Sequence, residues 1–210
     1  MKPRRIILVR HGQSEGNADQ MAYYRTQDYK LNLTETGREE ARNAGIKISN
    51  LIGEEGLYVY ISPYFRTRQT YDEISKSVSH NVTQTTEDPR LREQDWGHLR
   101  HPDDSKLIEN ERDEYGTFYY RIPSGESGAD VYDRVSTFFE TIHRDFSKPD
   151  FPENVLIVTH GLTLRLFLMR WLHWSVEMFE SAASPANCQI VIMEKQEDER
   201  FHLVSELKRK

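Results

Sequence analysis

Cysteine and long apolar runs are the scarcest features of this 210-residue sequence. The lone cysteine, Cys188, excludes an intrachain disulfide and a zinc site built from several cysteines. No stretch approaches the roughly 18 apolar residues that a membrane-spanning helix needs. The first apolar run, residues 6–9, is also too short for the core of a signal peptide. These absences predict a cytoplasmic protein that does not enter a membrane.

The sequence also lacks an excess of basic residues, because it has 28 Lys and Arg but 34 Asp and Glu, and its formal net charge is −6. A general binder of the nucleic-acid backbone would carry the opposite sign, so nucleic acid is not expected as a partner. Any affinity for an anion must come from a local cluster of positive groups. The composition leaves the oligomeric state open.

Short apolar runs alternate with helical patterns along the chain. Strands are expected at 5–9, 57–61, 82–85, 155–159, 189–193 and 201–206, and helices from 34, after 62–63, at 129–146 and at 162–172. This alternation predicts an α/β fold, a three-layer α/β/α sandwich with a mostly parallel central sheet. No linker or repeat divides the sequence. We therefore expect a single domain over 1–210, with a lid-like insert around 98–128.

Two of the expected strands end in a histidine that is followed by a glycine. These histidines are His11 and His160, and Arg10 directly precedes the first. Arg66 lies in the first turn of the helix that follows strand 57–61. Ligands of parallel sheets bind beyond the carboxyl ends of the strands, so these four side chains are predicted to meet in one crevice. A lone His-Gly turn is usually just a turn, but two of them with arginines favour a site.

Phosphoryl transfer through a phosphohistidine suits this combination of side chains. Guanidinium groups bind phosphoryl oxygens bidentately, and an imidazole attacks phosphorus from an unprotonated ring nitrogen. Nearby arginines lower the pKa of an imidazole, and a backbone carbonyl is expected to hold the proton on its other nitrogen. We expect the attacking histidine to face solvent at its strand end. The sequence contains no cluster of metal ligands, so no metal is expected.

A family resemblance becomes visible at this point. Residues 8–17, LVRHGQSEGN, resemble the signature of the histidine phosphatase superfamily, in its phosphoglycerate mutase-like branch. Further similar stretches follow in the family's order, namely 33–37, 62–70, 90–93, 96–97, 125–127 and 155–165. The resemblance implies that His11 is the nucleophile and Glu93 the proton donor. It implies that the phosphate is bound by Arg10, Ser14, Asn17, Arg66, His160 and Gly161.

A carboxylic acid at Glu93 suits the chemistry, since the leaving alkoxide must be protonated. Arg90 and Arg92 flank Glu93 and would lower its pKa if they faced the same way. Alternation along an extended segment is expected to place Arg92 on the opposite face. Glu126 is expected to tie down the turn before the helix at 129–146 rather than to act in catalysis.

The same pocket could pass a phosphoryl group to water or to a second hydroxyl group. A mutase must also hold a carboxylate and a second phosphate, yet 97–123 contain six acidic against four basic residues and lack the arginine pair that mutases carry here. Gly16 stands where mutases have tryptophan. We expect cofactor-free hydrolysis of a small phosphomonoester. The alternative is a phosphoglycerate mutase with 2,3-bisphosphoglycerate as cofactor, and an inactive scaffold is less favoured.

Overall fold

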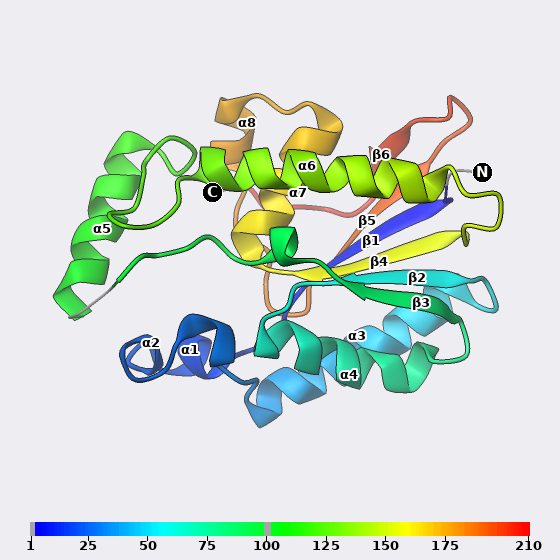
Figure 1. Ribbon diagram of the computed structural model, residues 1–210, viewed down its shortest axis with the longest axis horizontal. Coiled ribbons are helices and arrows are strands. Elements are labelled where there is room, and N and C mark those ends of the chain that lie inside the picture. The colour runs from blue at the N-terminus through cyan, green and yellow to red at the C-terminus, as the bar shows by residue number, and fades with distance from the viewer. Residues whose placement is uncertain (1–2, 99–101) are drawn as a thin grey trace.

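The computed structural model describes residues 3–98 and 102–210. Its centre is a six-stranded sheet in the order β3-β2-β4-β1-β5-β6 (Figure 1). The strands are β1 (Arg5–Arg10), β2 (Leu57–Ile61), β3 (Val82–Glu87), β4 (Asn154–Thr159), β5 (Ile190–Lys195) and β6 (Phe201–Leu203). The first four in the sheet order are parallel, whereas β5 and β6 are antiparallel to their neighbours. The predicted α/β fold with a mostly parallel sheet is confirmed.

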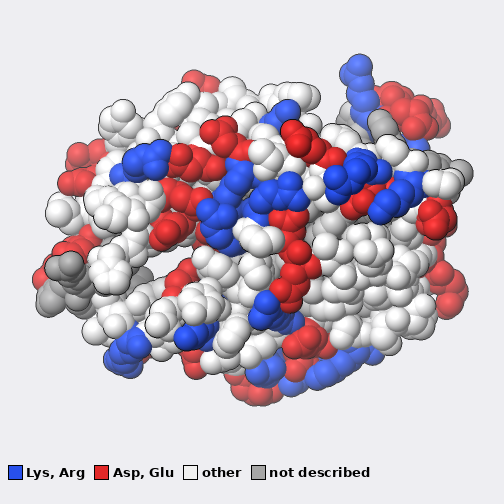
Figure 2. Space-filling model, in the orientation of Figure 1, with Lys and Arg blue, Asp and Glu red and all other residues white. Residues whose placement is uncertain are grey.

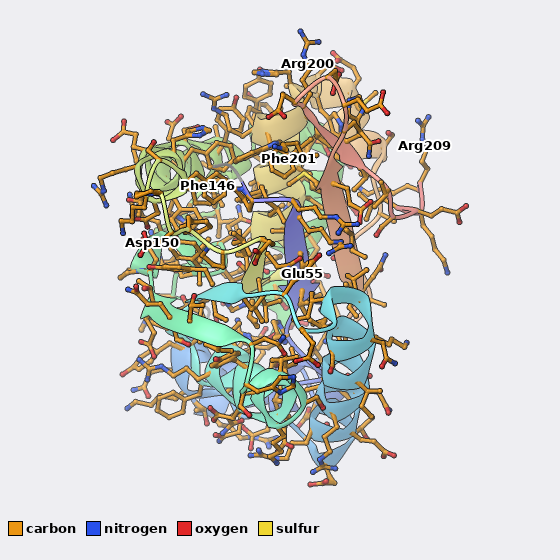
Figure 3. All side chains as sticks on the ribbon, turned by 90° about the vertical axis from the view of Figure 1, so that its right-hand side faces the viewer. Glu55, Phe146, Asp150, Arg200, Phe201 and Arg209 are labelled. Atoms are coloured by element: carbon orange, nitrogen blue, oxygen red, sulfur yellow. The ribbon has the colours of Figure 1, made fainter. Side chains whose placement is uncertain are left out.

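Long helices cover both faces of the sheet, which Figure 3 shows from its end. On one face lie α3 (Glu35–Ile52) and α4 (Phe65–Val78), and on the other lie α6 (Gly128–Phe146) and α7 (Gly161–Leu172). The remaining helical elements are α1 (Glu15–Ala18), α2 (Ala22–Arg25), α5 (Pro102–Tyr115), α8 (Val176–Ser181) and the 3₁₀ turns η1 (Asp28–Lys30) and η2 (Pro89–Leu91).

Alternation along the strands builds a separate core on each face. Ile7 and Val9 of β1 pack in the cluster under α3 and α4, whereas Ile6 and Leu8 pack in the cluster under α6 and α7. All four side chains are buried completely, which is why the strand reads as an unbroken apolar run. Phe138 of α6 is fully buried too, and its burial contributes about 2–3 kcal/mol.

Side-chain caps start α3 and α6, two of the four long helices. The Thr34 hydroxyl accepts a hydrogen bond from the Gly37 amide at 3.1 Å and begins α3. Ser127 and Asp130 form a reciprocal capping box at the start of α6. Each of these contacts satisfies amide groups that have no partner inside the helix.

The helices α5 and α8 were not predicted. The residues of α5 are mostly charged and have weak apolar periodicity, so tertiary contacts rather than pattern define it. Together with α1 and α2, α5 lies beyond the carboxyl ends of the parallel strands (Figure 1). The expected insert at 98–128 contains α5, but residues 99–101 of it lie outside the described residues. Within 3–98 and 102–210, no helix is long and apolar enough to cross a membrane.

Candidate active site

Two histidines meet at the carboxyl ends of the central strands. Because β1 and β4 are parallel and pair Arg10 with Thr159, the next residue of each strand occupies the same level of the sheet. The amide of His11 donates to the carbonyl of Thr159 at 2.9 Å. The ring centroids of His11 and His160 are 5.2 Å apart, with an angle of 62° between the planes.

His11 has a defined tautomer. Its Nδ1 lies 2.8 Å from the carbonyl oxygen of Gly12, which can only accept, so Nδ1 carries the proton and Nε2 has a free lone pair. The side chain does not face solvent as expected, because the residue is only 3% exposed. Burial, followed by the charges of Arg66 and Arg10, lowers the pKa of His11 well below its usual value. The imidazole is therefore neutral at neutral pH.

His160 is held by a neighbouring strand end. Its Nε2 lies 2.7 Å from the hydroxyl of Ser62, which follows β2, and its buried Nδ1 has no hydrogen-bond partner in the part of the chain that the structure describes. The Tyr64 ring lies edge-on at 5.0 Å between centroids. Burial, with the Arg66 charge as the next cause, lowers the pKa of His160 well below its usual value. When Ser62 donates to Nε2, the proton of the neutral ring lies on Nδ1.

Arg66 is buried beside the histidines and is paired with an acid. It is 2% exposed, and its guanidinium donates to Asp28 Oδ1 at 2.8 Å, Asp28 Oδ2 at 3.3 Å and the Asp28 carbonyl at 2.7 Å. The Arg66 Nε atom has no hydrogen-bond partner within residues 3–98 and 102–210. Asp28 lies in η1, so the segment that contains η1 fixes the direction of this guanidinium.

Arg10 lies against the start of α7. Its Nη1 donates to the carbonyl of Pro185 at 2.6 Å, and no described residue forms a hydrogen bond with its buried Nε. A Cβ atom on Gly161 would lie 2.7 Å from the Ser184 hydroxyl and 3.6 Å from Arg10 Nε. Glycine at 161 therefore makes room for both groups at the edge of the pocket.

Ser14 and Asn17 form a helix cap. The buried Ser14 hydroxyl accepts from the Asn17 amide at 3.3 Å, and the Ser14 amide donates to Asn17 Oδ1 at 3.2 Å. This reciprocal pair begins α1. The Ser14 side chain thus lies in the cap, whereas Asn17 is exposed and keeps its Nδ2 group without a partner among the described residues.

Glu93 reaches the start of α7 from the other side of the pocket. The Thr163 hydroxyl, which donates to the Arg92 carbonyl at 2.7 Å, lies 3.2 Å from Glu93 Oε1, and the Leu162 amide approaches Glu93 Oε2 at 3.4 Å. Neither flanking arginine contacts this carboxylate. Arg92 pairs with Glu126 and Arg90 with Asp88, so the expected opposite facing of Arg92 is what the structure has.

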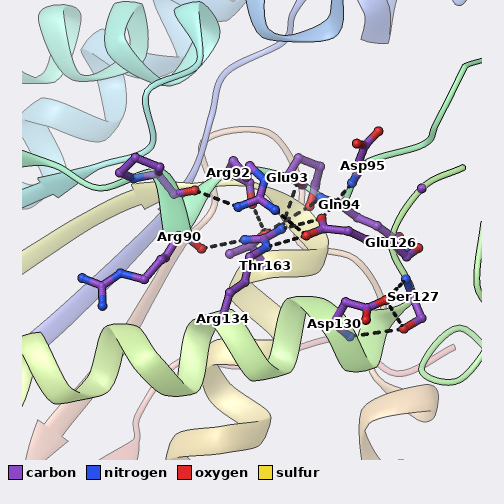
Figure 4. Close-up of polar contacts among 12 residues, drawn as sticks. Arg90, Arg92, Glu93, Gln94, Asp95, Glu126, Ser127, Asp130, Arg134 and Thr163 are labelled. Carbon is purple, nitrogen blue, oxygen red and sulfur yellow. Dashed lines mark hydrogen bonds and ion pairs between the residues drawn. The ribbon is translucent and has the colours of Figure 1, made fainter.

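Glu126 has a different task from the one predicted, because it holds the segment that carries Glu93 (Figure 4). Its Oε1 accepts from Arg92 at 2.5 Å and from Arg134 Nε at 3.0 Å. Its Oε2 accepts from the Asp95 amide at 3.0 Å and from Arg134 Nη2 at 3.1 Å. Arg134 also donates to the carbonyls of Arg90 at 2.6 Å and Glu93 at 3.1 Å. This Glu126–Arg134 clamp, formed by a residue just before α6 and a residue within it, holds residues 90–95 in place.

Asp28, Ser62 and Asn187 shape the site but were missed at the level of sequence. Ser62 follows β2, which neighbours β4, so the strand order would have placed it beside His160. Asn187 precedes β5, whose first residues lie beside the end of β1 because the pair is antiparallel. Asp28 carries no comparable signal in the sequence.

The surface around this site has mixed charge. Figure 2 shows acidic and basic side chains interspersed, with a hollow between the surfaces over α5 and over α1 and α2. The described residues contain no group of three or more His, Cys, Asp or Glu arranged to hold a metal ion. Positive charge is supplied by buried guanidinium groups, which oxyanions bind readily.

The fold and the site together define a class of protein, an α/β protein with paired imidazoles and guanidinium groups at its strand ends. Comparison with known families identifies that class. Residues 6–206 match the histidine phosphatase superfamily (branch 1), and the chain belongs to this family.

Individual relatives agree with the family. The chain is 45% identical over 205 residues to the phosphoglycerate mutase-like protein AT74 of Arabidopsis thaliana, an alignment that covers 91% of this chain but only 65% of that protein. It is 28% identical to the broad-range acid phosphatase DET1 of Saccharomyces cerevisiae, with 93% and 86% of the two chains covered. A solved structure described as mycobacterial hydrolase 1 has the same fold, with a TM-score of 0.77, 22% identity and 99% coverage of both chains.

Proposed function

We propose that this protein hydrolyses phosphomonoesters of small molecules through a phosphohistidine at His11. The observation that carries the proposal is a set of buried nitrogens without a hydrogen-bond partner among the described residues, namely Arg10 Nε, Arg66 Nε and His160 Nδ1. Arg68, Arg112 and Arg165 also have a buried Nε without a partner among the described residues, so this feature by itself does not identify a phosphate site. The three pocket nitrogens belong to side chains gathered around one neutral imidazole. A phosphoryl group offers the oxygens that would satisfy them.

In the first step, the lone pair of His11 Nε2 forms a bond to phosphorus. Nδ1 keeps its proton and its contact with the Gly12 carbonyl, so the ring stays oriented as it becomes positively charged. The bond between phosphorus and the ester oxygen breaks, and Glu93 gives its proton to that oxygen. Arg10, Arg66 and His160 stabilise the charge on the other phosphoryl oxygens.

In the second step, water attacks phosphorus and the P–N bond breaks. The Glu93 carboxylate takes a proton from the attacking water, which restores the acid for the next cycle. The electron pair of the P–N bond returns to His11 Nε2, and inorganic phosphate leaves. Every group is then in its starting state.

Hydrolysis rather than mutase activity is supported by the charges of α5, the helix beyond the strand ends. Its first turn contains Asp103 and Asp104, and its only basic residues are Lys106 and Arg112. Arg112 donates to Gln94 at 3.1 Å and stacks over the Trp96 ring at 5.1 Å, so it is already bound to the segment after Glu93. The charges of α5 therefore offer little electrostatic attraction for a second phosphate group.

The remaining expectations complete the proposal. Those residues of the insert around 98–128 that the structure describes would act as a lid on the single domain, and the hydrogen bond from Tyr24 Oη to Ser105 Oγ, 2.8 Å long, supports contact between α2 and α5. No metal or organic cofactor would take part, because the guanidinium groups supply the electrostatic stabilisation. Arg10, Ser14, Asn17, Arg66, His160 and Gly161 would contact the phosphate. We place the protein in the cytoplasm, which its single cysteine permits.

The test compares hydrolysis with mutase activity in one preparation. p-Nitrophenyl phosphate, alkyl and sugar phosphates, and 3-phosphoglycerate with and without 2,3-bisphosphoglycerate would be assayed. We expect cofactor-independent release of phosphate, and mutase turnover that exceeds hydrolysis and rises with the cofactor would overturn the proposal. Glu93→Gln should slow alkyl phosphates about a hundredfold but p-nitrophenyl phosphate only about fivefold or less, because nitrophenolate needs no proton to leave. The exposed His80→Gln serves as the control variant, with unchanged rates.

A further inference from the structure

A loop near the C-terminal end of the chain forms hydrogen bonds with the end of β1, next to His11. This loop, residues 183–189, connects α8 to β5. Its Cys188 amide donates to the carbonyls of Arg10 at 3.1 Å and His11 at 3.3 Å. The Asn187 side chain lies between two acceptors, because its Nδ2 is 3.1 Å from the His11 carbonyl and 3.1 Å from Asn17 Oδ1.

The orientation of the Asn17 and Asn187 side-chain amides follows from neighbouring groups that can act only as hydrogen-bond donors or only as acceptors. The Ser14 amide can only donate, so the Asn17 atom 3.2 Å from it must be the oxygen. The His11 carbonyl can only accept, so the Asn187 atom that faces it must be the nitrogen. That same Asn187 nitrogen then donates to Asn17 Oδ1. The two assignments agree with each other.

Asn17 Oδ1 is therefore occupied by donors on two sides, from Ser14 and from Asn187. The Asn17 Nδ2 group has no partner among the described residues, and the residue is exposed. We propose that Asn187 is a positioning residue that keeps the Asn17 amide turned so that Nδ2 donates to a phosphoryl oxygen. The proposal rests on the proposed function only in taking this pocket as the phosphate site.

Binding of inorganic phosphate, measured by calorimetry, tests the proposal without any turnover. Asn17→Ala should weaken phosphate binding about tenfold, since it removes one hydrogen bond to a charged group. Asn187→Ala should weaken it by about three- to tenfold, because Ser14 still holds Asn17 Oδ1. In the Asn17→Ala background, Asn187→Ala should then cost less than about twofold.

The control variant lies in the same loop but contacts neither amide. Gln189 Oε1 accepts from the Ala186 amide at 2.9 Å, so Gln189→Ala loosens the loop and keeps the Asn187 donor. We expect its phosphate affinity to change less than about twofold. If Asn187→Ala does not fold, as judged by circular dichroism, Asn187→Ser is used in the same cycle, since a hydroxyl can still donate to one acceptor.

Two results would overturn the inference. One is a double variant in which the losses of Asn17→Ala and Asn187→Ala multiply, and the other is a loss in Gln189→Ala as large as that in Asn187→Ala. Either would mean that the loop acts through general packing. Failure of the proposed function is distinguishable, because a protein that binds phosphate with this coupling but hydrolyses no ester would leave the inference intact.

Discussion

Neutralising Glu126 should displace the catalytic acid Glu93 without removing its carboxyl group. In Glu126→Gln, one of the two oxygens that accept from Arg92, Arg134 and the Asp95 amide becomes a nitrogen that cannot accept. Arg134 is only 10% exposed and Glu126 15%, so the loss leaves a largely buried cation without its acid. Breaking a fully buried pair costs about 3–5 kcal/mol. The two carbonyl contacts of Arg134 remain, and we expect about 2–3 kcal/mol here.

The catalytic effect should depend on the leaving group. Residues 90–95 lose their fixed position, and Glu93 no longer meets the leaving oxygen at the correct distance, an error that can cost about a hundredfold. The value of kcat/KM for an alkyl phosphate should fall about 30- to 100-fold, and that for p-nitrophenyl phosphate less than about fivefold. In Glu93→Gln, adding Glu126→Gln should not slow alkyl phosphates further.

Stopped assays with both substrates, together with urea unfolding, would measure these effects. Arg121→Ala is the matched control, because the exposed Arg121 pairs with the half-buried Asp130 nearby and this pair does not touch residues 90–95. Its stability should change by less than about 0.5 kcal/mol. Equal slowing of both substrates by Glu126→Gln, in a folded protein, would refute the idea that the clamp acts through Glu93.

Further predictions concern charge in the pocket. Asp28→Asn should lower the free energy of unfolding by about 1–2 kcal/mol, because Arg66 loses its carboxylate partner. The same variant should bind the inhibitor inorganic phosphate more tightly, because a negative charge that repels phosphate is removed. Weaker inhibition would contradict this and mean that Asp28 mainly orients Arg66. Burial keeps the pKa of His11 and of His160 below 6.5 in the folded state, whereas the unfolded chain binds these protons near pH 6.5. The free energy of unfolding should therefore be at its full value above about pH 6.5 and fall below it, by up to about 1.4 kcal/mol per pH unit for each histidine. His11→Gln with His160→Gln should flatten this fall in urea titrations from pH 7 to 5, and an unchanged slope would contradict the assignment.

Much of the fold was predictable because strong local patterns and tertiary packing agree. The strand at Leu57–Ile61 and the helix that ends at Phe146 combine unbroken or periodic apolar residues with clear boundaries. The short α1 and α2 and the acidic α5 have no such pattern. Their positions depend on contacts with distant residues, such as Tyr24 with Ser105, which periodicity does not encode.

The candidate site was predictable where strand ends define it and not where loops do. His11, His160 and Arg66 follow strands, so parallel pairing alone brings them to one edge. Asp28 and Asn187 lie in turns whose paths depend on side-chain contacts, and Glu126 acts 33 positions from Glu93 through a buried arginine. The solvent-facing expectation for His11 failed because the residue is buried at the strand end, where Asn187 and Cys188 donate to its carbonyl.

The central claim is that His11 carries the phosphoryl group between substrate and water. A reaction with a ³²P-labelled phosphomonoester would be quenched rapidly without acid. The protein would then be digested to peptides at alkaline pH, at which phosphohistidine is stable, and the labelled peptide identified. The account predicts label on the peptide that contains His11, and none in His11→Gln. Label at His160, at a carboxylate, or nowhere during measurable turnover would contradict it.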